Sequence, residues 1–86
     1  MDLNLIKEAT VKNVYHISAE SKVPMHAHEK HDEIFYCIKG SGIGVLEDGE
    51  IEFSVGKAMI VPAGKKHSLK SNGDLYVTAF LIPIIE

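Results

Sequence analysis

The sequence of 86 residues predicts an all-β domain. Valine and isoleucine together number 17, against 12 leucines and alanines, and this balance favours strands over helices. Short apolar runs alternate with turn signals along the chain, and none keeps the helical i, i+3, i+4, i+7 spacing over three turns. Because the chain is too short for two independent cores, we expect residues 1–86 to form one domain.

Only the first ten residues are a candidate for a helix, because the rest of the chain reads as strands. Eight apolar or alternating runs follow, each bounded by glycine, proline or polar residues. The expected strands are 11–18, 22–28, 33–39, 41–47, 50–54, 58–61, 67–71 and 75–82.

Glycine, asparagine and proline mark the reversals between these strands. Asp48-Gly49 is typical of a two-residue hairpin, since both central residues of a type I′ turn have positive φ. Asn72-Gly73 predicts a second turn of this kind. The other reversals are expected at Gly40, Gly56 and Pro62-Ala63-Gly64.

Eight short antiparallel strands fit a sandwich, a jelly roll or a small barrel, all of which limit exposed sheet edges. The strands around 34–38 and 80–82 are apolar on both faces, whereas a small barrel buries only one face. We therefore expect a homodimer in which a second copy covers the outer face. Tyr36 has the parity of that outer face.

Composition argues against several classes of partner. The net charge is −3 and arginine is absent, so a basic surface for nucleic acid is not expected. The single cysteine, Cys37, cannot form an internal disulfide, and the first residues lack the pattern of a signal peptide. No apolar run approaches 18 residues, so no membrane association is expected. We predict a soluble protein of the cytoplasm.

Histidines gather in one short stretch, which contains His26, His28 and His31. On a strand, His26 and His28 would point to the same face about 7 Å apart, so both imidazoles could reach one metal ion. Five histidines in a chain of this length make such a pair common by chance, and two surface histidines are an equally good interpretation.

Glu33 strengthens the metal hypothesis. It lies five residues after His28, an odd interval, so a reversal at 29–32 is needed to turn its carboxylate to the same interior. Phe35 and Cys37 would then share its face and line the same cavity. A fourth ligand, His67, follows the Pro62-Ala63-Gly64 turn.

Three imidazoles and one carboxylate suit one divalent transition-metal ion per chain, namely Mn, Fe, Co, Ni, Cu or Zn. Thiolate-rich and oxygen-only sites are excluded by this donor set. Four protein ligands leave one or two coordination positions for a substrate, water or dioxygen, so the predicted site is open.

With these residues in place, the sequence resembles the cupin family. The first cupin motif is matched by the pair His26 and His28, four residues, Glu33, six residues and Gly40. The second is matched by a glycine, five residues, Pro-x-Gly, two residues and a histidine; these are Gly56, Pro62, Gly64 and His67.

Two positions depart from the cupin pattern. Glu20 stands in place of the leading glycine, and Ser71 stands in place of the closing asparagine, with Asn72 one residue later. Neither position is a metal ligand, so the departures concern turn geometry. The resemblance implies a jelly-roll β-barrel (a double-stranded β-helix), a metal near one mouth of the barrel, and frequent dimers.

Cupins include dioxygenases, isomerases, decarboxylases and epimerases, as well as non-enzymatic sugar-binding and regulatory modules, so two functions stay open. The first is a metalloenzyme acting on a small polar organic substrate, with no catalytic residue assigned outside the ligand set. The alternative is a non-catalytic, metal-dependent binding or sensor module for a small, sugar-like molecule. The absence of a helix-turn-helix pattern disfavours direct transcriptional regulation.

The remaining polar side chains are expected to have structural or solvent-exposed positions outside the metal site. His31 is expected in a solvated loop and His16 in a structural position on the first strand. Cys37 is expected to be a packed, inert thiol, because no basic neighbour is evident to lower its pKa. Lys65 and Lys66 flank the Pro-x-Gly turn as a solvated pair that could attract an anionic ligand.

Overall fold

The structure, a computed structural model, describes residues 2–21 and 23–85. One short helix, α1 (Leu3–Ala9), precedes five strands that pair antiparallel throughout. The strands are β1 (Val11–Ser18), β2 (His31–Leu46), β3 (Gly49–Ser54), β4 (Ala58–Val61) and β5 (His67–Pro83). The all-β prediction is therefore confirmed, and within the described ranges no helix is long and apolar enough to cross a membrane.

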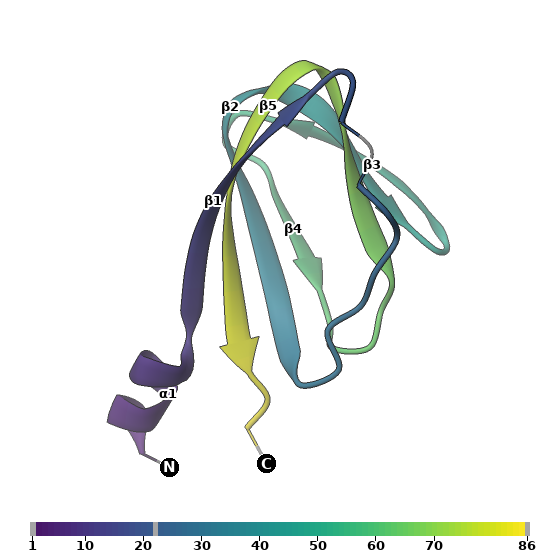
Figure 1. The fold of residues 1–86 in the computed structure, drawn as a ribbon. Coiled ribbons are helices and arrows are strands. Elements are labelled where there is room, and N and C mark those ends of the chain that lie inside the picture. Colours follow the sequence, from purple (N-terminus) through teal and green to yellow (C-terminus); the bar gives the residue numbers. More distant parts are fainter. Residues whose placement is uncertain (1, 22, 86) are drawn as a thin grey trace.

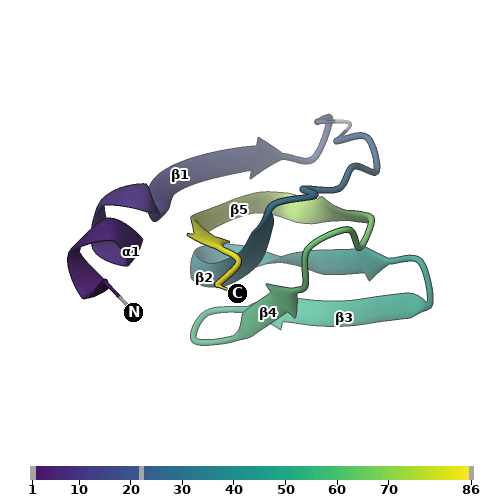
Figure 2. The ribbon, with the colours of Figure 1, turned by 90° about the horizontal axis from the view of Figure 1, so that it is seen from below.

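The two long strands β2 and β5 run through the whole fold. Their ladder extends from the pair His31 and Pro83 to the pair Leu46 and His67. It bends halfway, where the register shifts on either side of Lys39 and Gly40. One half of the ladder lies with β1 and β4, and the other half lies with β3, so the sheet curls into two facing layers (Figures 1 and 2). This curled sheet is the small antiparallel jelly-roll barrel that the resemblance implies.

The bend corrects two expected reversals. The expected strands 33–39 and 41–47 merge into β2, which ends one residue earlier at Leu46, and 67–71 and 75–82 are both part of β5. Gly40 has a φ of 84°, which only glycine adopts easily, but there it bends a continuous strand. Asn72-Gly73 lies in the facing irregularity of β5. Glycine is typical both of a chain reversal and of a bend within a continuous strand, and the sequence alone does not distinguish the two.

Two further expectations are modified by the structure. Residues 23–28 do not form a strand; among them only His26 makes an isolated β-bridge, and its partner is His67. The first residue of the expected strand, Lys22, lies outside the described residues. The β2–β3 hairpin turns at Glu47-Asp48, because Leu46 already pairs with Gly49. No described residue other than glycine has a positive φ, so Asp48 does not adopt type I′ geometry.

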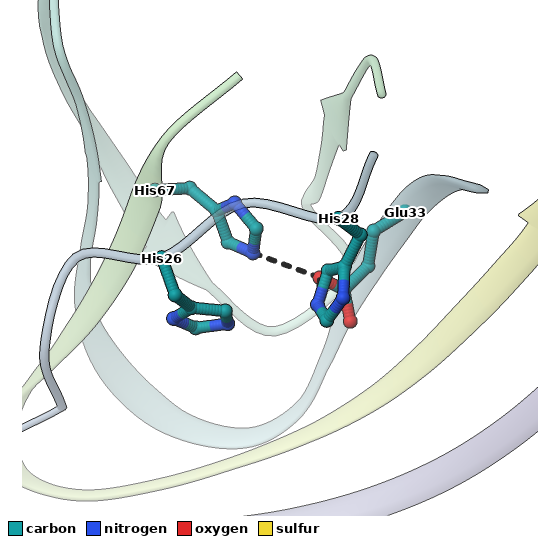
Figure 3. Close-up of side chains that lie close together, drawn as sticks. All are labelled: His26, His28, Glu33 and His67. Atoms are coloured by element: carbon teal, nitrogen blue, oxygen red, sulfur yellow. Dashed lines mark hydrogen bonds and ion pairs between the residues drawn. The ribbon is translucent and has the colours of Figure 1, made fainter. Parts of the chain in front are cut away.

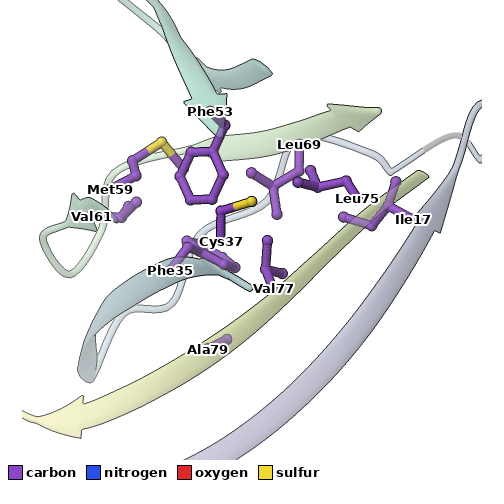
Figure 4. Packing of buried hydrophobic residues seen from close by; sticks show 10 residues of the cluster. All are labelled: Ile17, Phe35, Cys37, Phe53, Met59, Val61, Leu69, Leu75, Val77 and Ala79. Carbon is purple, nitrogen blue, oxygen red and sulfur yellow. The ribbon is translucent and has the colours of Figure 1, made fainter. Parts of the chain in front are cut away.

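The core lies between the two layers (Figure 4). Inward positions alternate along β2, β4 and the second half of β5, as strand geometry requires. The buried apolar residues are Ile17, Phe35, Cys37, Phe53, Met59, Val61, Leu69, Leu75, Val77 and Ala79. Burial raises the pKa of the Cys37 thiol, which keeps it neutral and inert as a nucleophile.

Candidate metal centre

Four side chains converge at one end of the barrel: His26, His28, Glu33 and His67 (Figure 3). One potential ligand atom from each lies within 4.8 Å of all the others. Two ligands on opposite sides of one ion at about 2.0–2.2 Å are about 4 Å apart, so the four donors need only small movements to share an ion. Glu33 and His67 are buried, whereas His26 and His28 are partly exposed.

Backbone hydrogen bonds hold the histidine segment against β5. The His26 N–H donates to the His67 carbonyl at 3.0 Å, and the His67 N–H donates back at 2.9 Å. The Gly64 N–H donates to the His28 carbonyl at 2.8 Å. Both sides of the 26–28 segment are thereby tied to the segment 64–67.

The Pro-x-Gly turn before His67 has the geometry that the sequence suggests. The Lys65 N–H donates to the Pro62 carbonyl at 3.1 Å, and Gly64 has a φ of 83° at the third position, as in a type II turn. The Asp32 carboxylate accepts a hydrogen bond from the Ala63 N–H at 2.8 Å, which ties the turn to the start of β2.

Glu33 reaches the site because the chain bends before β2. The bend falls at residues 29–30, within the expected 29–32, and places Glu33 on the inward face together with Phe35 and Cys37. Glu33 and His67 lie toward opposite ends of the β2–β5 ladder, about 13 pairs apart. A straight ladder would separate them by roughly 40 Å, and only the bend brings their side chains together.

Hydrogen bonds to the backbone determine which imidazole nitrogens face inward. His67 Nδ1–H donates to the Lys65 carbonyl at 3.1 Å, and His26 Nδ1–H donates to the Pro24 carbonyl at 2.9 Å. A carbonyl oxygen only accepts, so the proton of each neutral ring is on Nδ1 and the lone pair is on Nε2. This arrangement is the one in which metal-ligating histidines are usually held.

The inward nitrogens face a carboxylate. His67 Nε2 lies 2.8 Å from Glu33 Oε1, and His28 Nε2 lies 3.3 Å from the same oxygen. For His67, whose Nδ1 carries the proton of the neutral ring, this contact would join two acceptors, so a cation must lie between them, either a proton or a metal ion. The donor set therefore fits a divalent transition-metal ion.

The pKa of His67 reflects the same arrangement in the metal-free protein. Burial by itself lowers this pKa, but the hydrogen bonds to the Glu33 carboxylate and the Lys65 carbonyl, together with the negative charge of Glu33, outweigh burial. The pKa of His67 therefore lies above its ordinary value of 6.5. A proton on Nε2 takes the place that a metal ion would otherwise fill.

The other polar residues singled out from the sequence lie apart from this cluster. His31 begins β2 and is not one of the four. His16 Nε2 lies 2.6 Å from Asp74, and its ring stacks on Tyr76; sequence analysis missed both partners because they lie on another strand. Lys65 Nζ lies 3.4 Å from the Asp48 carboxylate.

A pocket of about 270 Å³ opens beside the cluster. Of the four clustered side chains, His26 and His67 contribute to its wall. Phe35 lines it as expected, with its ring centroid 5.5 Å from that of His67, whereas Cys37 belongs to the core and not to the described lining. Strand alternation predicts which side chains point inward, but it does not predict which of the inward side chains lie next to the pocket.

Known proteins resemble this chain in sequence and in fold. An uncharacterized protein from Methanocaldococcus jannaschii is 24% identical over 84 residues, which cover 86% of this chain and 67% of that protein. A cupin protein from Bacteroides fragilis has a TM-score of 0.79 at 20% identity, covering 90% of this chain and 70% of that one. A predicted oxalate decarboxylase from Thermotoga maritima has a TM-score of 0.81 at 22% identity, covering 98% and 76%.

These structural likenesses show the fold alone, since each is below 25% identity. The family model described as "Cupin domain" matches residues 13–83, which is most of the chain and includes all four clustered residues. The protein therefore belongs to the cupin family.

Proposed function

We propose that this cupin binds one divalent transition-metal ion through His26, His28, Glu33 and His67, and that it is a metalloenzyme acting on a small organic molecule. The observation that carries the proposal is the orientation of His67. Its Nδ1–H is held by a backbone carbonyl, so its Nε2 faces the Glu33 carboxylate across a position that a metal ion, or in its absence a proton, fills.

The donor set suits Mn, Fe, Co, Ni, Cu or Zn. Such an ion, when bound, supplies Lewis-acid or redox chemistry to a molecule in the adjoining pocket. The chain itself contributes three imidazoles, two of them held by backbone carbonyls, a buried carboxylate and a pocket wall in which the buried Phe35 ring limits access of water.

One observation favours the second candidate, a non-catalytic binding or sensor module. Apart from the proposed ligands, the titratable side chains among the described residues lining the pocket are Tyr15 and His16, and His16 is already paired with Asp74. General acid–base chemistry would thus depend on Tyr15 or on the ligand set itself.

Elemental analysis of the purified protein, followed by a turnover screen with the metal found, tests the proposal and separates the two candidates. We expect about one transition-metal ion per chain and chemical conversion of at least one small substrate. Binding of small molecules without conversion would favour the sensor module. A purified protein that neither contains nor takes up a transition metal would contradict the metal site.

Metal removal is expected to lower the melting temperature more at about pH 8 than at about pH 5.5. In the metal-free protein the pKa of His67 is raised, so its ion pair with Glu33 stabilises the fold below about pH 6.5 and is lost as the pH rises through the folded-state pKa. Metal binding has the opposite dependence, since protons compete for the imidazoles. At a free metal concentration 100 times Kd, binding adds about 2.7 kcal/mol.

Differential scanning fluorimetry of metal-loaded and chelator-treated protein at both pH values measures this difference. A loss of melting temperature that is the same at both pH values would count against coordination by titrating imidazoles. Resupply of the metal should restore the loaded value, which controls for damage by the chelator.

We also propose that the outer face of the layer formed by β1, β5, β2 and β4 is the interface of a homodimer. On this face Ile34 pairs with Phe80 on one side and with Ile60 on the other. Val14 and Tyr36 lie on the same face, and the exposed fractions of Ile60 and Val14 are 67% and 63%. Lys12 and Thr78 lie on the same face, which is otherwise apolar at the positions named. An exposed, largely apolar surface of this kind is typical of an interface.

Replacing Ile60 by lysine is expected to convert a dimer into a monomer, because it places a charge beside Ile34 within this apolar face. Light scattering at micromolar concentration gives the mass directly. Val55→Lys is the matched control, because Val55 is 62% exposed and lies in the β3–β4 turn, away from the face. A monomeric wild-type protein would refute the interface.

A further inference from the structure

The pocket beside the metal cluster combines apolar side chains with two of the proposed metal ligands. Aliphatic and aromatic side chains make up half of the ten described lining residues and come from β1, the 19–28 segment, β2 and the first half of β5. They are Tyr15, Ile17, Val23, Phe35 and Leu69. His26 and His67 are part of the same wall, and His67 is buried. A molecule in the pocket would therefore meet two of the proposed metal ligands together with hydrocarbon.

The two serine hydroxyl groups in the wall already have partners. Ser68 Oγ–H donates to the Val23 carbonyl at 2.6 Å. Ser21 Oγ accepts from the Ser18 N–H at 3.2 Å and lies 2.9 Å from Ser18 Oγ. These serines stabilise the segment that covers the pocket, and a ligand with many hydroxyl groups would have to compete for them.

Formal charge is also scarce in the wall. The described lining includes no lysine, aspartate or glutamate. Lys65, which the sequence suggested as an attractor of anions, is instead held near Asp48. The one imidazole of the described wall outside the proposed ligands, that of His16, is already paired with Asp74. Removing a second charged group of a ligand from water against this wall would therefore cost more than apolar contact returns.

Taking the proposed metal site as given, we propose that the ligand or substrate of this cupin is a small molecule with one metal-chelating oxygen end and an apolar aliphatic or aryl body. Sugars and dicarboxylates fit this wall poorly, because apart from the Tyr15 hydroxyl and the paired His16 the wall offers few partners for the polar groups beyond the chelating end. The pocket, at about 270 Å³, is small compared with sites for drug-sized molecules, which limits the body to about one ring or a short chain.

Three hydroxamates test this proposal by calorimetry on the nickel-loaded protein. Acetohydroxamate and benzohydroxamate share a chelating end and differ in methyl against phenyl, and 4-carboxybenzohydroxamate adds a second charge. We expect benzohydroxamate to bind at least about tenfold more tightly than acetohydroxamate, since each buried carbon contributes about fourfold. The added carboxylate should remove most of that gain.

A pair of variants locates the preference in the pocket. Val23→Asp places a carboxylate in the wall and should reduce the phenyl preference to about twofold or less, whereas Val55→Asp, on an exposed turn, should keep it. The wild-type comparison of the three probes decides the proposal even if Val23→Asp does not fold.

The outcomes separate this inference from the proposed function. Equal affinity for the methyl and phenyl probes, or tightest binding of the carboxylated probe, would overturn the apolar ligand class while leaving the metal site intact. Failure of the protein to retain nickel, or of all three probes to bind the nickel-loaded protein, would overturn the open metal site and the ligand class with it.

Discussion

The double variant His26→Ala/His28→Ala is expected to purify with essentially no transition metal. These two imidazoles are half of the converging donor set, and the remaining pair, Glu33 and His67, already form an ion pair with each other when His67 is protonated. Loss of groups that merely orient a ligand costs 10- to 100-fold in metal affinity, and loss of two ligands should cost more. Mass spectrometry of the metal content, normalised to protein, measures the effect.

His31→Ala is the matched control for this variant. His31 is a histidine of the same segment, begins β2, and lies outside the group of four. It should retain the wild-type metal content. The backbone hydrogen bonds between His26 and His67 do not involve the replaced side chains, so the double variant should still fold, which circular dichroism verifies. Wild-type metal content in the folded double variant would rule out this site.

Gly42→Ala is expected to destabilise the fold by about 3 kcal/mol or more, at the upper end of the cost of forcing extra volume into a packed interior. A Cβ at Gly42 would overlap the carbonyl oxygen of Lys70 and press on the Leu75 side chain. The first obstacle is backbone in the β2–β5 ladder, which cannot move without breaking the pairing of Gly42 with Ser71. For a domain of this size the melting temperature should fall by roughly 12–24 °C.

Gly73→Ala is the matched control, since nothing lies within 4 Å of a Cβ at that position and Gly73 is not among the glycines with positive φ. It should change stability by about 0.5 kcal/mol or less. A melting temperature of Gly42→Ala within a few degrees of wild type would show that the two strands do not approach each other this closely.

Strand parity predicted much of the fold and of the candidate site. The alternation Glu33, Phe35, Cys37 correctly placed three side chains on the inward face, and the His-x-His spacing with the Pro-x-Gly turn identified all four clustered residues. These successes share a cause, since the direction of a side chain on a strand depends only on local geometry. The metal itself stays a prediction.

Long-range geometry was beyond the sequence. Gly40 and Asn72-Gly73 face each other across the ladder, and their composition is equally compatible with a reversal or with a bend in two paired strands. The pairing of Lys65 with Asp48 and of His16 with Asp74 depends on strand order, which no local pattern encodes. For the same reason the apolar wall beside His67 became visible only in three dimensions.

The bend in the β2–β5 ladder has a consequence for folding kinetics. Glu33 and His67 are far apart until the ladder has paired along its length and curled, so the complete donor set does not exist in any early, local element such as the β2–β3 hairpin. An ion that needs all four ligands cannot nucleate the chain. It would bind after the rate-limiting step of folding. Metal binding would therefore leave the folding rate nearly unchanged and lower the unfolding rate of the closed barrel.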